Sequence, residues 1–238
     1  MADIQHWPSW IQTSLGTPIE LYASPSFRWG QHLRPILLFG GVHGDEPEGV
    51  ALAQATLDWL KSEYQKGEGR GSSTDFCPWL LIPCLNPDGY QQKQRTNARG
   101  VDLNRNYPAS NWQPQAEKNR YWPGPAPGSE PETQGIVRLI REERPRLVIH
   151  CHSWEPCIVY TGEPGANDAR RLAQVTGYEA RDHIGYPTPG SLSHFAWHDQ
   201  GIPVICIEAQ EKSPLSEVWP RFKDGIAAIF RDTSPRIP

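Results

Sequence analysis

The stretch ILLFGGVHGDEPEG at residues 36–49 decides the fold. Its first four residues are apolar and suit a buried strand, the glycines suit a tight turn, and an amphipathic segment follows. Ligands of α/β proteins bind at such a place, just outside the carboxyl ends of the strands. His43 and Glu46 lie on this turn and could share one zinc ion with a distant third ligand and a water molecule. The alternative is that His43 only stabilises the turn and that Glu46 is a solvated acid at the start of a helix.

The composition limits the classes of function. A chain of 238 residues is long enough for one sizeable α/β domain and too short for two, so we expect a single domain over residues 1–238. A net charge of −4 argues against nucleic acid as a partner. No apolar stretch has the length of a membrane span, and the first residues lack the features of a signal peptide. We therefore expect no membrane association and a cytoplasmic location.

The cysteines lie in or beside apolar runs and show no CxxC pairing. They are Cys77, Cys84, Cys151, Cys157 and Cys206. An odd number of cysteines without export signals predicts reduced, buried thiols and disfavours a zinc site made of cysteines.

Periodicity predicts strands that alternate with helices. Strands are expected at 19–23, 36–39, 79–83, 147–154, 158–161 and 203–208. Helices are expected at 48–64, 131–144, 168–176 and 215–230, with one more around Phe195 and Trp197 that Ser191 caps. The remaining segments are expected to be an irregular cap at 1–18, a mobile surface loop at 65–75, a turn at 86–89 and a long loop beside the site at 109–130.

A basic segment stands out in this acidic chain. Residues 93–108 contain a single acid, Asp102, and four basic residues, which are Lys93, Arg95, Arg99 and Arg105. Arginine is suited to bidentate recognition of carboxylate or phosphate groups. The segment therefore indicates either a solvated basic loop or a positive pocket for a small anionic substrate, and we favour the pocket.

Further candidates for metal chemistry lie where two other predicted strands end. His150 and His152 alternate onto the same side of the strand at 147–154, and Glu208 ends the strand at 203–208. A short-spaced ligand pair, a remote third ligand and a spare carboxylate is the arrangement of a hydrolytic zinc site. Zinc lowers the pKa of water from 15.7 to about 7, and a carboxylate can then act as general base. The alternative for Glu208 is that it pairs with an arginine.

Five ordered motifs now carry a family resemblance. They are His43-Gly-Asp-Glu46, Asn86-Pro-Asp-Gly89, Gly100-Val-Asp-Leu-Asn-Arg-Asn106, His152-Ser-Trp154 and Ile207-Glu208. Together they resemble the zinc carboxypeptidases of the M14 family over roughly residues 34–210. The resemblance implies an α/β fold with a central mixed, mostly parallel β-sheet flanked by helices. Within the family, the segment YPTPGSL at 186–192 looks most like the amidases that cut the γ-D-glutamyl–meso-diaminopimelate bond of cell-wall peptides in the bacterial cytoplasm.

The resemblance also implies roles for the reacting groups. It makes His43, Glu46 and His152 the ligands of one zinc ion per chain. Glu208 becomes the general base and acid. Arg95 would polarise the scissile carbonyl and stabilise the developing oxyanion.

The resemblance extends to residues that would hold the substrate. Asn104 and Arg105 would bind the free carboxylate beside the scissile bond, and Asp102 would orient the first histidine ligand through its other ring nitrogen. Tyr186 aligns with a mobile tyrosine that closes over bound substrate. Near the pocket for the terminal side chain we expect Ser193 and His194.

Several neighbouring residues have competing interpretations. His150 could be mistaken for a ligand, and we interpret it as a core histidine or one that supports the ligands. Arg99 is the alternative oxyanion donor, and Tyr186 could be a plain packing aromatic residue. Trp154 and Tyr107 are expected to be wall residues of the pocket.

The leading hypothesis is a zinc hydrolase that removes a carboxylate-bearing residue, and its partner is a small anionic peptide of the murein tripeptide kind. An N-acyl amino-acid hydrolase of the aspartoacylase or succinylglutamate desuccinylase kind, or a general metallocarboxypeptidase, is the alternative enzyme. A non-catalytic binding module with the same fold is the alternative of another class, although such a module is expected to lose a ligand or the base. No oligomeric state is predicted.

Overall fold

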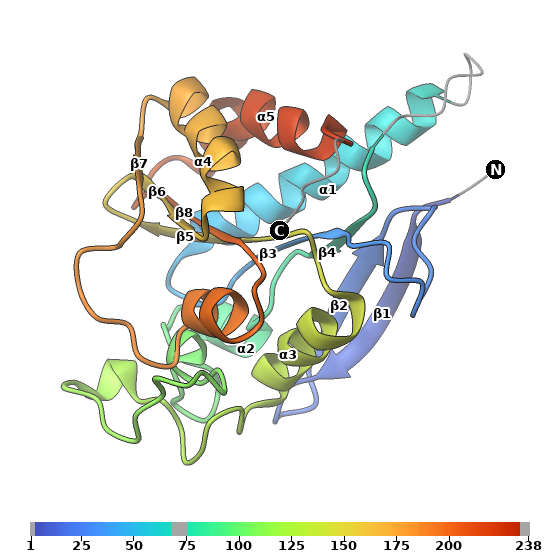
Figure 1. Ribbon diagram of the computed structural model, residues 1–238. Coiled ribbons are helices and arrows are strands. Elements are labelled where there is room, and N and C mark those ends of the chain that lie inside the picture. The colour runs from blue at the N-terminus through green and yellow to red at the C-terminus, as the bar shows by residue number, and fades with distance from the viewer. Residues whose placement is uncertain (1–2, 68–75, 234–238) are drawn as a thin grey trace.

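The computed structural model describes residues 3–67 and 76–233, which are built around one eight-stranded sheet (Figure 1). The strands lie in the order β1-β2-β4-β3-β5-β8-β6-β7. Their bounds are β1 Gln5–Gln12, β2 Pro18–Ala23, β3 Ile36–Gly40, β4 Trp79–Ile82, β5 Leu147–Trp154, β6 Cys157–Thr161, β7 Glu179–Arg181 and β8 Val204–Gln210. The four central strands β4, β3, β5 and β8 are parallel, whereas β1, β2 and β6 introduce antiparallel pairs. The expectation of a mixed, mostly parallel sheet is confirmed.

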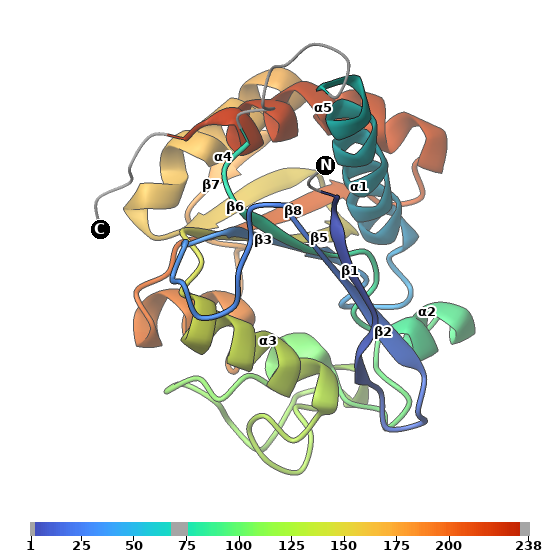
Figure 2. The same ribbon diagram turned by 90° about the vertical axis from the view of Figure 1, so that its right-hand side faces the viewer.

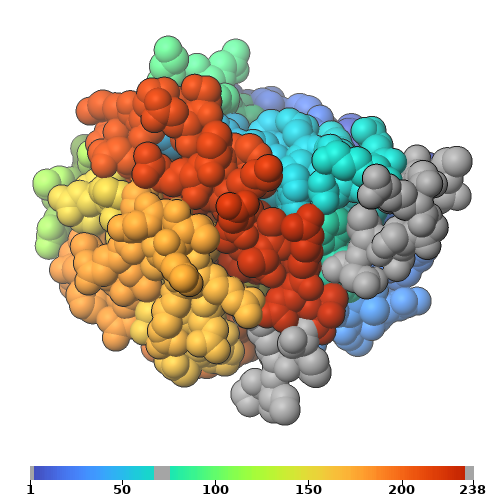
Figure 3. All heavy atoms as spheres, turned by 90° about the horizontal axis from the view of Figure 1, so that it is seen from above, coloured from blue at the N-terminus to red at the C-terminus, as the bar shows by residue number. Residues whose placement is uncertain are grey.

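Helices cover both faces of the sheet (Figure 2). They are α1 Pro47–Gly67, α2 Pro87–Gln92, α3 Pro131–Glu143, α4 Glu163–Thr176 and α5 Leu215–Arg231, with the short helices η1 Leu103–Arg105, η2 Asn119–Tyr121 and η3 His194–Asp199. Helices α1, α4 and α5 lie side by side over one face, and they form the surface seen in Figure 3. Helix α3 and the loops from residue 100 to 130 lie on the other side (Figure 2).

The apolar side chains form two layers because side chains along a strand alternate between its faces. Ile36 and Leu38 of β3 pack with α1, α4 and α5, while Leu37 and Phe39 pack with α3 and η3. All four side chains are fully buried, as expected of a central parallel strand covered on both faces. Among the described residues, no helix is long and apolar enough to span a membrane.

Two glycines allow α1 to begin directly against the ends of β3 and β5. A Cβ atom on Gly40 would overlap the carbonyl oxygen of Gly49, and one on Gly49 would overlap the carbonyl oxygen of Cys151. Only glycine permits these approaches of backbone to backbone. The close packing fixes the turn at 43–46 at the carboxyl edge of the sheet.

The N-terminal prediction was wrong, because residues 5–12 form the edge strand β1 and not an irregular cap. The strand carries Pro8, which an edge strand tolerates, and both its faces are partly exposed, so no clean apolar alternation marks it. The predicted turn at 86–89 instead starts helix α2, where the Asn86 side chain accepts a hydrogen bond from the Gly89 amide at 2.9 Å.

Other predicted boundaries shift by a few residues. Helix α1 continues to Gly67, so residues 65–67 of the expected loop are helical, and 68–75 lie outside the described residues. Helix α4 begins at Glu163, five residues before its predicted start, and strand β7 was not predicted. The five cysteines all lie in the described part of the chain. Cys77, Cys151, Cys157 and Cys206 are buried, as expected, whereas Cys84 is only partly buried.

Candidate metal centre and its pocket

Two histidines and a glutamate converge at the carboxyl edge of the central strands. Glu46 Oε1 lies 2.8 Å from His43 Nδ1, and Glu46 Oε2 lies 2.7 Å from His152 Nδ1. The two Nδ1 atoms are 3.0 Å apart. His43 and Glu46 come from the turn before α1, and His152 comes from β5 next to it. The fold therefore brings together the three residues that the sequence proposed as metal ligands.

The hydrogen bonds around this cluster make it suited to a cation. Asp102 Oδ1 lies 3.1 Å from His43 Nε2 and, as a carboxylate, accepts the proton of that nitrogen. The Nδ1 atom of His43 then presents a lone pair to the Glu46 carboxylate. A nitrogen lone pair and a carboxylate at such short distance require a positive charge between them. A divalent metal ion or a proton supplies that charge, so the residues present fit a zinc ion.

The pKa shifts have the same origin. Burial raises the pKa of Glu46, but His43 and His152 outweigh it and hold that pKa well below its usual range. Burial likewise opposes ionisation of Asp102, yet His43 and Arg95 keep its pKa below the ordinary value. Both carboxylates are therefore ionised at neutral pH and can accept from, or bind, cationic groups.

A second group of possible ligands shares His152. His150 Nδ1 lies 2.8 Å from His152 Nε2, and the Cys206 thiol is close to both rings. A thiol binds zinc as a thiolate. Burial raises the pKa of Cys206 well above its ordinary value, and the nearby Glu208 charge raises it further. We favour the group with Glu46 as the metal site, because it supplies an ionised carboxylate. His150 then contacts the far nitrogen of His152 and can support that ring.

Glu208 lies on β8 directly opposite His152 on β5 in the register of the parallel pair. Its side chain is 8% exposed, and Cys206 Sγ donates to its Oε1 at 3.4 Å. Burial raises the pKa of Glu208 to about 8, with a further contribution from the charge of Glu46. A carboxylate with a raised pKa beside a metal site is able to accept and return a proton near neutral pH.

The two candidate oxyanion donors occupy different places. Arg95 donates from Nε to Asp102 Oδ2 at 2.9 Å and from Nη1 to Glu46 Oε1 at 3.2 Å, so its guanidinium adjoins the cluster. Arg99 is instead half-exposed, with Nε 3.7 Å from Glu130 Oε2. Arg95 lines the cavity over His43, Glu46 and His152, and Arg99 does not. The geometry favours Arg95.

A cavity of about 480 Å³ lies over the cluster and is lined by the residues that were predicted to bind substrate. Asn104 Oδ1 accepts a hydrogen bond from the Leu192 amide at 3.0 Å, and Arg105 Nη1 donates to the Asn104 carbonyl oxygen at 2.8 Å. Tyr186 is 46% exposed at the cavity rim, with its ring 5.8 Å from that of Trp154 in an edge-on arrangement. Both aromatic residues line the cavity, in agreement with the expectation for Trp154.

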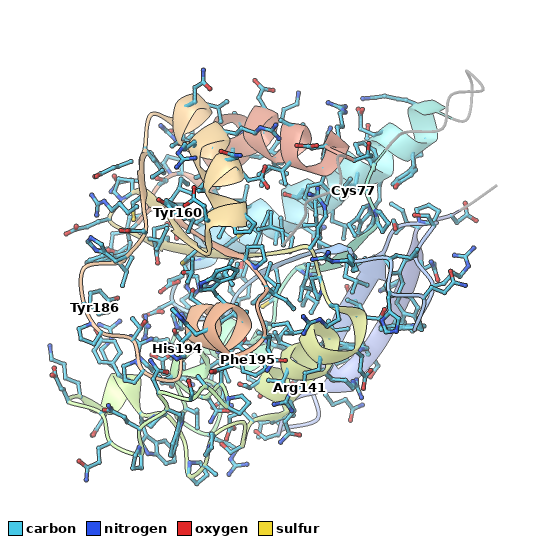
Figure 4. All side chains as sticks on the ribbon, viewed as in Figure 1. Cys77, Arg141, Tyr160, Tyr186, His194 and Phe195 are labelled. Atoms are coloured by element: carbon cyan, nitrogen blue, oxygen red, sulfur yellow. The ribbon has the colours of Figure 1, made fainter. Side chains whose placement is uncertain are left out.

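The loop and helix from Tyr186 to His198 form one wall of the cavity. Figure 4 shows Tyr186 on the loop before η3, and His194 and Phe195 on that helix. Ser191 Oγ accepts the His194 amide at 3.3 Å, which supports the predicted cap. His194 Nε2 lies 3.0 Å from Ser110 Oγ of the 109–130 loop. Ser193 and His194 both line the cavity.

Tyr107 was expected in the wall, and this expectation was wrong. Its side chain is fully buried and stacks on Phe195, with the ring centroids 6.1 Å apart. Phe195 also lies 5.5 Å from the Arg141 guanidinium of α3 (Figure 4). Tyr107 therefore belongs to the core beneath the cavity.

Sequence reasoning missed two features of the site. Ser153 Oγ donates to Glu48 Oε2 at 2.6 Å in a buried pair that fastens the end of β5 to the start of α1. Arg120 and Tyr121 of η2 line the cavity. The 109–130 loop was expected to adjoin the site, but no periodicity marks which of its side chains point inward.

Comparison with known proteins agrees with this geometry. The zinc carboxypeptidase family (Peptidase M14) matches residues 20–180. Murein peptide amidase A of Escherichia coli K12 is 32% identical over 232 residues, covering 91% of this chain and 86% of that protein. The crystal structure of the murein-tripeptide amidase MpaA of E. coli O157 has a TM-score of 0.72 and 28% identity, covering 98% of this chain and 93% of that one. A carboxypeptidase A of Helicoverpa armigera, 17% identical over 98% of this chain and 70% of its own, has a TM-score of 0.74 and shows the shared fold.

Proposed function

This chain belongs to the zinc carboxypeptidase family and is a hydrolase, and from that premise we propose that it acts as a murein peptide amidase. The bond cut is the amide between the γ-carboxyl of D-glutamate and meso-diaminopimelate. The observation that carries the proposal is the joint position of the His43, Glu46 and His152 cluster, the Glu208 carboxylate and an arginine-lined cavity. The 32% identity to a murein peptide amidase over most of both chains supports the substrate class.

We propose that His43 Nδ1, Glu46 and His152 Nδ1 bind one zinc ion per chain. Asp102 keeps His43 in the tautomer that leaves Nδ1 free, and His150 contacts the far nitrogen of His152. Bound zinc would supply Lewis acidity, which polarises a carbonyl group and lowers the pKa of water.

Glu208 is the group proposed to move protons. Its carboxylate would accept a proton from the attacking water and deliver that proton to the nitrogen of the leaving amine. Its position opposite His152 and its raised pKa support this role. Cys206 donates to one carboxylate oxygen and so limits the orientations that Glu208 can adopt.

The arginines are proposed to bind the charged parts of the substrate. Arg95, which is fixed by Asp102 and Glu46, would donate to the carbonyl oxygen as negative charge develops on it. Asn104 and Arg105 would bind the carboxylate next to the scissile amide, because a planar guanidinium pairs with a carboxylate in two parallel hydrogen bonds. Tyr186, which is half-exposed at the rim, would close over the bound peptide.

The experiment that tests the proposal compares three substrates. The zinc-loaded protein is given L-Ala-γ-D-Glu-meso-diaminopimelate, N-acetyl-aspartate and a peptide that ends in an α-linked phenylalanine. We expect release of diaminopimelate from the first, at a kcat/KM at least tenfold above that for the others, and loss of this activity with a chelator. Faster cleavage of N-acetyl-aspartate or of the α-linked peptide would refute the substrate assignment, and no cleavage of any substrate would favour a binding module.

A further inference from the structure

Three guanidinium groups surround one aromatic ring in the wall of the cavity. The Cζ atoms of Arg95, Arg105 and Arg120 lie 5.2, 5.6 and 5.3 Å from the centre of the Tyr121 ring. The four residues all line the cavity but come from three segments, since Arg120 and Tyr121 belong to η2 of the 109–130 loop. Cations at this distance from a ring centre are attracted by its negative face. The positive charge of these three arginines is therefore concentrated around the Tyr121 ring.

The three arginines differ in what else they bind. Arg95 is bound to two carboxylates, those of Asp102 and Glu46. Arg105 is nearly buried and donates to the Asn104 carbonyl. For Arg120, the ion-pair partner within the described residues is Asp45, whose Oδ2 lies 3.7 Å from Nη2. That distance is too long for a hydrogen bond, and the Arg120 side chain is 54% exposed, so its donors can turn to a ligand.

The proposed substrate needs a second carboxylate site, and this step rests on the proposed function. A peptide cut at an ordinary α-linkage has no free α-carboxylate on the acyl side, because the α-carboxyl carbon is the scissile carbonyl itself. A γ-linked glutamyl residue keeps its α-carboxylate free on the acyl side. The carboxylate of the leaving residue lies on the other side of the scissile bond, where Asn104 and Arg105 are proposed to act.

Arg120 is placed for the acyl-side group. Its partner Asp45 immediately precedes Glu46 in the turn that contributes two of the proposed zinc ligands. Without Arg120, Asp45 would repel an anionic acyl group at this position. We propose that Arg120, held on the Tyr121 ring, binds the α-carboxylate of the γ-linked glutamyl residue and so selects γ-linked over α-linked acyl groups.

The test changes the charge on either side of this contact. The substrates are L-Ala-γ-D-Glu-meso-diaminopimelate and the same peptide with the glutamyl α-carboxylate converted to a primary amide. The enzymes are the zinc-loaded wild type, Arg120→Gln and the control Arg138→Gln. Arg138 is also an arginine over an aromatic ring, 5.7 Å from the centre of Trp10, but it lies on α3 and does not line the cavity.

We expect the wild type to prefer the carboxylate peptide to the amide by roughly 10- to 100-fold in kcat/KM, the range for a hydrogen bond between charged groups. Arg120→Gln should lose this preference because its kcat/KM for the carboxylate peptide falls. Its kcat/KM for the amide peptide should change by less than about twofold. Arg138→Gln should behave as the wild type. Zinc content and melting temperature, measured for each variant, should match those of the wild type.

Two results would overturn the proposal for Arg120. One is an equal loss on both peptides in Arg120→Gln, which would indicate a general effect on the site. The other is a wild type that cleaves both peptides at the same rate, which would leave the proposed amidase function intact. If the wild type cleaves neither peptide, the proposed function itself fails, and the two failures are thus distinguished.

Discussion

Asp102→Asn tests how His43, a proposed zinc ligand, is oriented. The Asp102 side chain is fully buried. Its Oδ1 accepts from His43 Nε2 at 3.1 Å and from the Asn104 amide at 2.9 Å, and its Oδ2 accepts from Arg95 Nε at 2.9 Å. The substitution keeps the shape of the side chain, removes the charge and turns one acceptor oxygen into a donor.

Either orientation of the new amide is unfavourable. With its oxygen toward His43, its NH₂ group faces the N–H of Arg95, donor to donor. With its NH₂ group toward His43, that ring must accept at Nε2 and carry its proton on Nδ1, the atom proposed to bind zinc. Loss of such a supporting carboxylate lowers metal affinity by roughly 10- to 100-fold, or about 1.4–2.7 kcal/mol.

The assay is competition for zinc with a chromophoric chelator at neutral pH. We expect the Kd for zinc to rise by roughly 10- to 100-fold in Asp102→Asn. Asp58→Asn is the matched control, because Asp58 lies exposed on α1, where it accepts from Gln54 at 3.1 Å, away from the site. A zinc affinity of Asp102→Asn within twofold of the wild type would refute the argument that this carboxylate fixes His43.

Three further predictions concern other charged side chains. Glu208→Gln should keep zinc and lose at least about 10³-fold in kcat, because the proton-transfer group is gone; zinc analysis and steady-state kinetics measure both. Arg95→Lys should lower kcat by roughly 10²- to 10³-fold through loss of a fixed oxyanion donor, whereas Arg99→Lys should stay within twofold. Burial raises the pKa of Glu132 from its ordinary 4.5 to about 7, with Glu130 adding to the effect. This carboxyl group therefore ionises at lower pH in the unfolded chain than in the folded one. Its contribution to the free energy of unfolding falls as pH rises from 4.5 to 7. Relative to the wild type, Glu132→Gln should gain up to about 3 kcal/mol in free energy of unfolding between pH 4.5 and pH 8, as measured by urea denaturation.

A different result would contradict each of these predictions. Loss of zinc from Glu208→Gln would make that residue a ligand. Equal effects of Arg95→Lys and Arg99→Lys would remove the distinction that the geometry draws between them. A stability difference between Glu132→Gln and the wild type that does not vary with pH would show that this carboxyl group has the same pKa in the folded and unfolded chains.

The fold could be predicted where burial imposes a period on the sequence. Strand β3 is apolar on both faces, and α1 carries apolar residues at helical spacing, so both were found. Strand β1 was missed because an exposed edge strand needs neither a continuous apolar run nor strict alternation. Tyr107 was misplaced because its burial depends on Phe195, a residue far along the chain that only the folded structure brings near.

The site could be predicted to the extent that its residues adjoin strand ends. His43 follows β3, while His152 and Glu208 lie near the carboxyl ends of β5 and β8, and the parallel order of those strands brings them together. Arg120 and Tyr121 had no such signal, because they lie in a long loop whose course is set by contacts with distant segments. The pocket wall made by that loop is visible only in three dimensions.

The most direct test of the whole account is a crystal structure of the zinc-loaded protein with anomalous data collected on both sides of the zinc absorption edge. The account predicts one zinc ion, bound by His43 Nδ1, Glu46 and His152 Nδ1, with Glu208 nearby but not bound. A zinc ion held by His150, Cys206 and the other nitrogen of His152 would contradict it.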